Sequence, residues 1–298
     1  MRVAESGATA AANEAPREFF YRLPGRPGGS RPGMHASRAT GPGSAFASHG
    51  RLFDRPDPRR LDLRASLTSV PREWLVRVNH QRSGAMLHAI VDVSASMHFG
   101  AGGGKLGVAT DFLRSLGYSA FRSGDAVGSS AFDAVVRDEA SVPARSGRGV
   151  GEAMAGALGA LRGEAPRAGG VAALESCASR TRGAALVFLV SDFHFELDGL
   201  QAVIESLAPA LVVPLVVRDP AELEPPSGNG WIELIDAESG RRRPLWLRES
   251  TRRAWRENVA RREAELDAAF RASEVRALRL VGAFEAEALT RHFVETIA

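Results

Sequence analysis

Two apolar runs of strand length constrain the fold of this chain most, because an aspartate follows each of them closely. Residues 88–91 lead into Asp92-Val-Ser94-Ala-Ser96, and residues 185–190 lead into Ser191-Asp192. Apolar runs bounded in this way are typical of strands in the core of a sheet. If the two strands are parallel neighbours, both aspartates lie at the carboxyl edge of the sheet, where α/β proteins carry their sites.

Strands and helices alternate along the middle of the chain. We expect strands at 86–93, 126–132, 185–190 and 211–217, and helices at about 106–121, 150–161, 172–179 and 200–207. This alternation predicts an α/β fold with a doubly wound, mainly parallel sheet.

Further elements flank this predicted sheet on both sides. The stretch 56–78 is expected to form a β-hairpin region that feeds the strand at 86–93, and 231–235 with 243–247 is a second predicted hairpin. A long helix with Trp255, Leu266 and Phe270 on one face, a strand at 276–281 and a last helix at 284–297 complete the chain. The predicted fold therefore adds a β-hairpin region and C-terminal helices to the sheet.

The first fifty residues differ in composition from the rest. They are rich in Gly, Pro, Ser, Ala and Arg and have few aliphatic residues, so we expect residues 1–50 to form an extended, partly disordered arm and residues 51–298 to form the folded domain. The segment Glu18-Phe-Phe-Tyr-Arg-Leu23 interrupts the arm with enough apolar surface to dock, either on its own domain, which we favour, or on a partner.

Composition excludes several classes of protein. No apolar stretch approaches the ~20 residues that cross a bilayer, and the N-terminus lacks the apolar segment of a secretion signal, so we expect a cytoplasmic protein without a membrane span. The single Cys177 agrees with that compartment. The net charge of +3 comes from arginines scattered among acids, with Lys105 as the only lysine, so we expect no nucleic-acid partner.

The two acidic loops offer ligands for a divalent cation. Asp92, Ser94, Ser96 and Asp192 present the hard oxygen atoms that Mg²⁺ or Mn²⁺ prefers. The alternative is that the serines cap the following helix and Asp92 accepts hydrogen bonds from loop amides. His98 and His194 lie close to these loops. Either they add nitrogen ligands for a transition metal or, as we favour, they point away from the ion onto a face that meets a partner.

These motifs resemble the von Willebrand factor A fold with its metal-ion-dependent adhesion site. More narrowly, the chain is similar to the MoxR-associated family of bacterial A-domain proteins, a domain of unknown function, from about Arg51 to the C-terminus. The resemblance rests on Pro56-Asp-Pro-Arg-Arg-Leu-Asp-Leu-Arg-Ala-Ser66, on Val91-Asp-Val-Ser-Ala-Ser-Met-His-Phe-Gly100 and on Leu189-Val-Ser-Asp-Phe193. It implies a metal site at these loops and a MoxR-type AAA+ ATPase as partner.

Within that family, the opening Phe19-Phe-Tyr-Arg-Leu-Pro-Gly25 and the lack of membrane helices are most similar to the MxaS-like accessory proteins of bacterial methanol-oxidation clusters. That resemblance implies a client metalloenzyme, a calcium-dependent dehydrogenase whose assembly or activation the protein assists.

The chain departs from the family pattern at the second metal loop. The family supplies a threonine ligand there in a Gly-Gly-Thr-x-Leu pattern before a helix, and we matched that loop to Ser146-Gly-Arg148-Gly-Val150, with arginine at the threonine position. Either Arg148 points outward and Ser146 or water takes its place, or its guanidinium replaces the metal and pairs with Asp92 and Asp192.

The sequence thus predicts a non-catalytic interaction domain that binds a partner through the loops after Asp92, Arg148 and Asp192. In the metal-bound version an open coordination position accepts a carboxylate from the partner. Two alternatives remain open: a metal-dependent hydrolase that uses Asp92 and Asp192 to activate water, and an interaction domain whose metal site is degenerate.

Overall fold

The computed structural model describes residues 15–24, 32–41, 43–100, 103–161, 168–235 and 241–296. Its centre is a six-stranded sheet with the strand order β11-β8-β7-β4-β5-β6. The strands are β4 (Met86–Asp92), β5 (Ala126–Phe132), β6 (Val136–Arg145), β7 (Leu186–Ser191), β8 (Leu211–Arg218) and β11 (Leu278–Val281). All neighbouring pairs in this sheet are parallel except β5 and β6. The predicted α/β fold with a mainly parallel sheet is confirmed.

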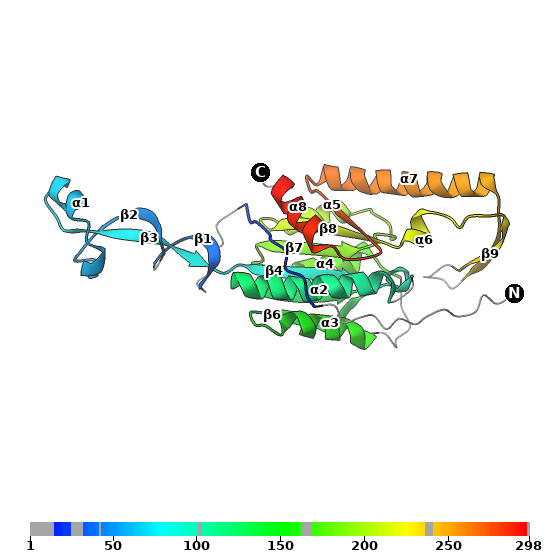
Figure 1. Ribbon diagram of the computed structural model, residues 1–298, viewed down its shortest axis with the longest axis horizontal. Coiled ribbons are helices and arrows are strands. Elements are labelled where there is room, and N and C mark those ends of the chain that lie inside the picture. The colour runs from blue at the N-terminus through cyan, green and yellow to red at the C-terminus, as the bar shows by residue number, and fades with distance from the viewer. Residues whose placement is uncertain are drawn as a thin grey trace.

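Helices cover both faces of this sheet, as Figure 1 shows. On one face α2 (Gly104–Ser123), α3 (Val150–Ala160) and α8 (Ala286–Thr296) pack on alternate strand residues such as Leu87 and Val91. On the other face α4 (Val171–Ser179), α5 (Leu200–Ser206) and α7 (Glu249–Ala272) contribute to a second core that includes Ile90. Because β4 and β7 are buried on both faces, their sequences are continuously apolar rather than alternating.

The segment 15–24 packs on its own domain, which confirms the favoured docking. Phe19 is buried in the core beside α2 and α8, with its ring centroid 6.3 Å from that of Phe112. The backbone N–H of Phe19 donates to Ser119 Oγ over 3.0 Å, and that of Phe20 donates to Thr290 Oγ1 over 3.1 Å. Hydroxyl groups on two helices therefore accept hydrogen bonds from the backbone N–H groups of this extended segment, which pairs with no strand among the described residues.

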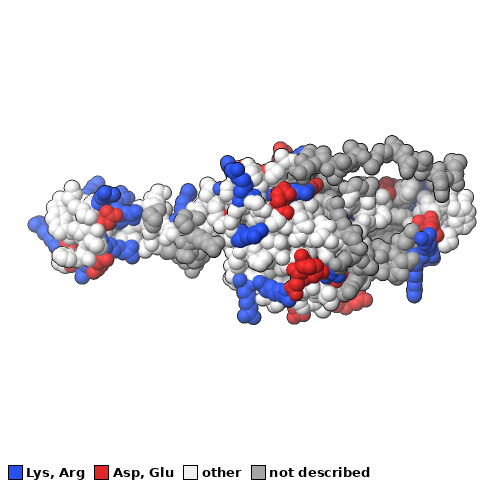
Figure 2. All heavy atoms as spheres, turned by 90° about the horizontal axis from the view of Figure 1, so that it is seen from below, with Lys and Arg blue, Asp and Glu red and all other residues white. Residues whose placement is uncertain are grey.

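A second, three-stranded antiparallel sheet projects from the body, as Figure 1 shows. Its strands lie in the order β1 (Pro32–Gly41), β3 (Leu75–Ser83) and β2 (Ala45–Arg51) across the sheet. Along the chain, the short helices η1 (Pro58–Arg60) and α1 (Leu63–Thr68) connect β2 to β3. We call residues 32–83 the β-arm. Arginine side chains gather on it (Figure 2).

The β-arm corrects part of the sequence analysis. Residues 32–41 and 45–51 form strands, where we expected an extended, partly disordered arm. The predicted hairpin region feeding the central strand is a three-stranded sheet, and β3 leads into β4 across Gly84 and Ala85. The expectation for residues 1–14, 25–31 and 42 lies outside the described residues. The β-arm precedes Met86, the first residue of β4, and Asp92 is the last residue of β4. The β-arm and Asp92 therefore lie at opposite ends of that strand.

The remaining elements lie beside the carboxyl edge of the main sheet. They are α6 (Pro220–Leu223) and the hairpin of β9 (Gly230–Ile235) and β10 (Arg242–Leu247), which precede α7 and match the predicted second hairpin. Among the described residues, no helix has the length and apolar character needed to span a membrane.

Candidate functional site

The two predicted aspartates meet at the carboxyl edge of the sheet. Asp92 is the last residue of β4 and Asp192 directly follows β7, and these neighbouring parallel strands are in register at Val91 and Val190. Both aspartates are fully buried. Burial, and then the nearby charge of Asp192, raises the pKa of Asp92 to about 7.

Hydroxyl and amide groups lie close to Asp92. Ser191 Oγ donates to Asp92 Oδ2 over 2.6 Å, and the backbone N–H of Ser94 donates to Asp92 Oδ1 over 2.8 Å. The hydroxyl oxygens of Ser94 and Ser96 are 3.2 Å apart. Asp92 thus accepts a loop amide, as the alternative reading expected. The side chain of Ser94 makes no capping hydrogen bond at the following 3-10 helix η2 (Ala95–His98).

Asp192 is paired with a buried lysine. Lys105 Nζ lies 2.5 Å from Asp192 Oδ2 and 2.5 Å from Glu222 Oε1, and the side chain of Lys105 is only 1% exposed. Although burial alone would raise the pKa of Asp192, the charge of Lys105 lowers it below its ordinary value, so this carboxylate stays ionised. A buried ammonium between two carboxylates is the kind of paired arrangement that a buried charge requires.

Sequence reasoning missed the role of Lys105, although the sequence contains a signal. The chain has 38 basic Lys and Arg side chains, and every one except Lys105 is arginine. Lysine is a compact point charge, whereas the planar guanidinium fork of arginine needs more room. A lone lysine at the start of the helix that follows Asp-x-Ser-x-Ser therefore indicates a position where arginine does not fit.

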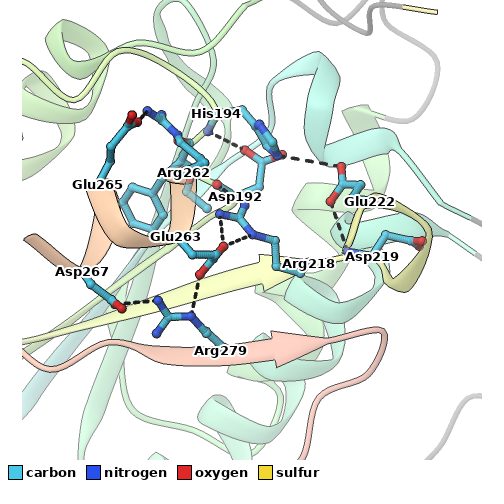
Figure 3. A network of polar contacts seen from close by, with 12 residues as sticks. Asp192, His194, Arg218, Asp219, Glu222, Arg262, Glu263, Glu265, Asp267 and Arg279 are labelled. Atoms are coloured by element: carbon cyan, nitrogen blue, oxygen red, sulfur yellow. Dashed lines mark hydrogen bonds and ion pairs between the residues drawn. The ribbon is translucent and has the colours of Figure 1, made fainter. Parts of the chain in front are cut away.

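A network of arginines holds the loop that carries Asp192 (Figure 3). Arg218, at the end of β8, is 4% exposed, donates to the backbone oxygen of Asp192 and pairs with Glu263 of α7 over 2.8 Å. Arg262 donates to the backbone oxygens of Phe193 and Phe195, each over 2.6 Å. These contacts fix the main chain around Asp192 from two elements, α7 and β8.

His194 and Glu222 form the outer part of the site, on the side of α6 (Figure 3). The side chain of His194 is 40% exposed, and its Nε2 lies 4.0 Å from Glu222 Oε1. Burial lowers the pKa of His194 below its ordinary value. One ligand atom from each of Asp192, His194 and Glu222 lies within 4.8 Å of the others, so the three residues form a possible metal site. His98, the other predicted flanking histidine, is half-buried at the end of η2.

The structure places Arg148 and Ser146 away from this edge. Strand β6 is antiparallel: it begins opposite Phe132 at the site edge and ends with Arg145 opposite Val127, so the residues after it lie at the other edge of the sheet. Arg148 is exposed, and its guanidinium lies 5.6 Å from the ring centroid of Phe121. Because α2 rises about 1.5 Å per residue, Phe121 is ~24 Å from Lys105 along that helix. The pairing of Arg148 with Asp92 and Asp192 is therefore corrected to the pairing of Lys105 with Asp192.

A different loop approaches the serines. A Cβ atom on Gly169 would lie 3.2 Å from Ser94 Cβ, so the segment directly before α4 adjoins the Asp-x-Ser-x-Ser loop. The sequence there is Gly169-Gly170-Val171, a Gly-Gly pair before a helix, with valine where the resemblance leads one to expect threonine. The Gly-Gly pair was the signal that matched this loop, and the choice of Ser146–Val150 overlooked it.

The residues present do not fit a divalent ion as they are arranged. Val171 brings no oxygen ligand, and the Lys105 ammonium already lies against Asp192 and Glu222, where it would repel a second cation. Asp192, His194 and Glu222 would accept a metal ion only after Lys105 withdrew.

Comparison with known proteins places the chain in a broad group. A family model described as "Protein of unknown function DUF58" matches residues 59–265. Comparison with curated proteins gave no match.

Among solved structures, the chain is similar to an aerotolerance-related membrane protein from Bacteroides fragilis, with 16% identity and a TM-score of 0.46 over 72% of this chain and 98% of that one. It is also similar to the conserved hypothetical protein BatB from Bacteroides thetaiotaomicron, with 13% identity and a TM-score of 0.41 over 72% and 98%. A von Willebrand factor type A protein from Catenulispora acidiphila shares 14% identity and a TM-score of 0.30 over 74% of this chain and 43% of that one.

Proposed function

This chain belongs to the DUF58 family, and on that premise we propose that it is a non-catalytic protein–protein interaction domain whose binding face is the carboxyl edge of the main sheet. One observation carries the proposal: Lys105 pairs with the buried Asp192 and also with Glu222, whose side chain is partly exposed to solvent. A charged cluster that opens at a loop edge is suited to recognising a charged group of a partner.

The bonding of the two aspartates supports a non-catalytic role. Asp92 accepts hydrogen bonds on both carboxylate oxygens, and Asp192 accepts from Lys105 on one oxygen and from the His194 backbone N–H on the other. A general base must lie within hydrogen-bond reach of the reacting group or of a bridging water, and both side chains are fully buried. Both carboxylates are instead engaged in holding loops.

The partner we propose is a MoxR-type AAA+ ATPase, and the setting is the cytoplasm. The support is the resemblance of the two metal loops and of residues 56–66 to the MoxR-associated family. The resemblance of the segment around Phe19 to MxaS-like proteins extends the proposal to a client, a methanol dehydrogenase whose maturation the complex assists.

The trio Asp192, His194 and Glu222 favours one second candidate, a metal-dependent hydrolase that would hold Mg²⁺ or Mn²⁺ there once Lys105 had withdrawn. Asp192→Asn separates the two functions, because an enzyme would lose turnover whereas an interaction domain would lose complex formation.

The test is capture of a purified MoxR-type ATPase from the same organism by the full chain and by two variants. Asp192→Asn keeps the shape of the side chain and removes its charge. Asp138→Asn is the matched control, since Asp138 is an exposed aspartate on β6 whose partner is Arg180. We expect Asp192→Asn to weaken capture about tenfold or more and Asp138→Asn to leave it unchanged. Equal capture by all three proteins would exclude the carboxyl edge as the binding face.

A further inference from the structure

The Lys105 ammonium bridges two carboxylates that differ in how firmly they are held. Its distances to Asp192 Oδ2 and Glu222 Oε1 are both 2.5 Å, but Asp192 is fully buried whereas the side chain of Glu222 is 20% exposed. We propose that Lys105 is the resident cation of this site, and that Glu222 is an intramolecular ligand occupying the position that a carboxylate of the partner takes on binding.

The inner carboxylate is locked in place. The main chain of Asp192 accepts a hydrogen bond from Arg218, which Glu263 holds in turn, and Asp192 Oδ1 accepts from the backbone N–H of His194. Phe193, between them, has a φ of 50°, so this turn is tightly constrained. The pair of Lys105 and Asp192 therefore remains when the outer ligand leaves.

The outer carboxylate is the replaceable one. Glu222 lies on α6, a helix of four residues, and its second oxygen, Oε2, accepts from the backbone N–H of Asp219 over 3.2 Å. Turning the Glu222 side chain away from Lys105 gives up that capping hydrogen bond and the contact with Nζ. The hydrogen bond from Trp255 Nε1 to the Glu222 backbone oxygen, over 2.8 Å, does not involve the carboxylate and still holds α6.

Charge determines which ligand fits the vacated position. Lys105 and Asp192 neutralise each other, and Glu222 adds one negative charge near the partly exposed ring of His194. A carboxylate from a partner offers the ammonium the same charge and the same kind of acceptor oxygen as Glu222 does. A divalent cation would instead have to expel the ammonium from between two carboxylates.

This inference rests on the proposed function, because it names the chemistry of the partner group that the same edge binds. It predicts that the native chain is self-occupied and that an acidic side chain competes with Glu222. It also predicts that the site works without a metal ion.

The test uses Glu222→Gln in the full chain, with Glu224→Gln as the matched control. Glu224 lies two residues further along, is exposed and pairs with Arg256 over 2.6 Å. The probe is a blocked hexapeptide of alternating Asp and Gly, compared by titration calorimetry with the same peptide in which Asn replaces Asp. We expect Glu222→Gln to bind the Asp peptide about tenfold tighter than the native chain does and Glu224→Gln to behave like the native chain. We expect the Asn peptide to bind none of the three proteins.

A spectroscopic measurement on the native fold keeps the test independent of any variant that unfolds. Because Lys105 is the only lysine, protein labelled with ¹⁵N-lysine gives one side-chain Nζ signal. We expect the Asp peptide to shift that signal in Glu222→Gln, and 5 mM MgCl₂ to leave it unchanged in the native chain. Lys105→Met, in contrast, is expected to gain Mg²⁺ binding.

Two outcomes would overturn the inference: no gain of peptide binding in Glu222→Gln, or Mg²⁺ binding by the native chain that disappears in Asp192→Asn. Failure here is distinguishable from failure of the proposed function. If Asp192→Asn abolishes capture of the ATPase while Glu222→Gln gains nothing, the interaction face stands and its ligand chemistry is wrong. If Glu222→Gln gains peptide binding while capture of the ATPase does not depend on Asp192, the carboxylate site stands and the ATPase binds to another face of the chain.

Discussion

The hydroxyl of Tyr21 donates a hydrogen bond to Asp125 Oδ2, which joins the N-terminal segment to the residue just before β5. His35 Nε2 of the β-arm lies 2.8 Å from the same oxygen, and the backbone N–H of Ala85 donates to Asp125 Oδ1 over 2.7 Å. Burial, and then the charge of Asp125, raises the pKa of Tyr21, so the phenol stays protonated as a donor. One carboxylate thus connects the N-terminal segment, the β-arm and the start of β4.

Asp125→Ala is expected to lower the free energy of unfolding by about 3–5 kcal/mol, because it leaves one buried and two half-buried donors without this acceptor. Asp111→Ala is the control, since Asp111 is 59% exposed and pairs with Arg114 on the surface. That change should cost less than about 1 kcal/mol. Urea unfolding measures both, and similar values for the two variants would contradict the role of Asp125.

Phe19 and Phe20 form a natural pair for testing the docked segment. Phe19 is 1% exposed and Phe20 is 69% exposed. Phe19→Ala leaves a cavity between α2 and the sheet and should cost about 3–5 kcal/mol of unfolding free energy, whereas Phe20→Ala should change it by less than ~0.5 kcal/mol. A small effect of Phe19→Ala would mean that the segment does not dock in solution.

The raised pKa of Asp92 predicts a pH-dependent cost of burial. The folded pKa, about 7, exceeds the ordinary value of 3.8, so between these pH values the folded state binds more protons than the unfolded state. The stability that Asp92 contributes is present in full below pH ~4, falls as the pH rises towards 7 and then stays level.

Asp92→Asn removes this dependence. Its stability relative to the native chain should rise by about 1–3 kcal/mol between pH 5 and pH 8. Urea unfolding at the two pH values measures the change, and other titrating groups cancel because both proteins contain them. Asp138→Asn, at an exposed position, should show no such difference. A constant offset for Asp92→Asn would rule out a raised pKa.

Arg218 offers a comparison between a buried and a surface ion pair. Arg218→Met removes one of the two arginine partners of Glu263, leaving Arg279, and removes the donor to the buried Asp192 backbone oxygen. It should lower the free energy of unfolding by about 1–3 kcal/mol. Arg276→Met breaks a surface pair with Glu295, in which both side chains are about half exposed, and should cost less than ~1 kcal/mol. Thermal or urea unfolding distinguishes them, and equal losses would show that the network around Asp192 carries no special weight.

The sequence predicted the sheet edge well because its signals are local. Strand ends at Asp92 and Asp192 follow from apolar runs, and parallel pairing then fixes which side chains meet. The direction of β6 is not local information. Its ten residues carry polar and charged side chains because it is an edge strand, so no clear pattern revealed it, and without its antiparallel course Arg148 was assigned to the wrong edge.

Lys105 escaped prediction for a different reason. The long aliphatic stem of a lysine separates its charged group from its backbone. The position of Lys105 in the sequence therefore does not indicate which carboxylates its ammonium contacts. Glu222 meets it from α6, the short helix beyond β8. The capping box of Asp219 and Glu222 marks a helix start but does not indicate a contact with Lys105. Strand β3 was predicted in part, from the alternation at 74–78. Strands β1 and β2 were missed, because few aliphatic residues mark them and the side chains of β2 are exposed or half-exposed.

The burial of the only lysine has a consequence for the covalent chemistry of this protein. Acylating reagents and amine-directed cross-linkers attack neutral amines that solvent reaches, and the Lys105 amine is shielded and held as an ion. In the folded chain its modification must await the departure of Glu222. The extent of acylation at this one position therefore reports, without a spectroscopic label, how often Glu222 leaves the Lys105 amine.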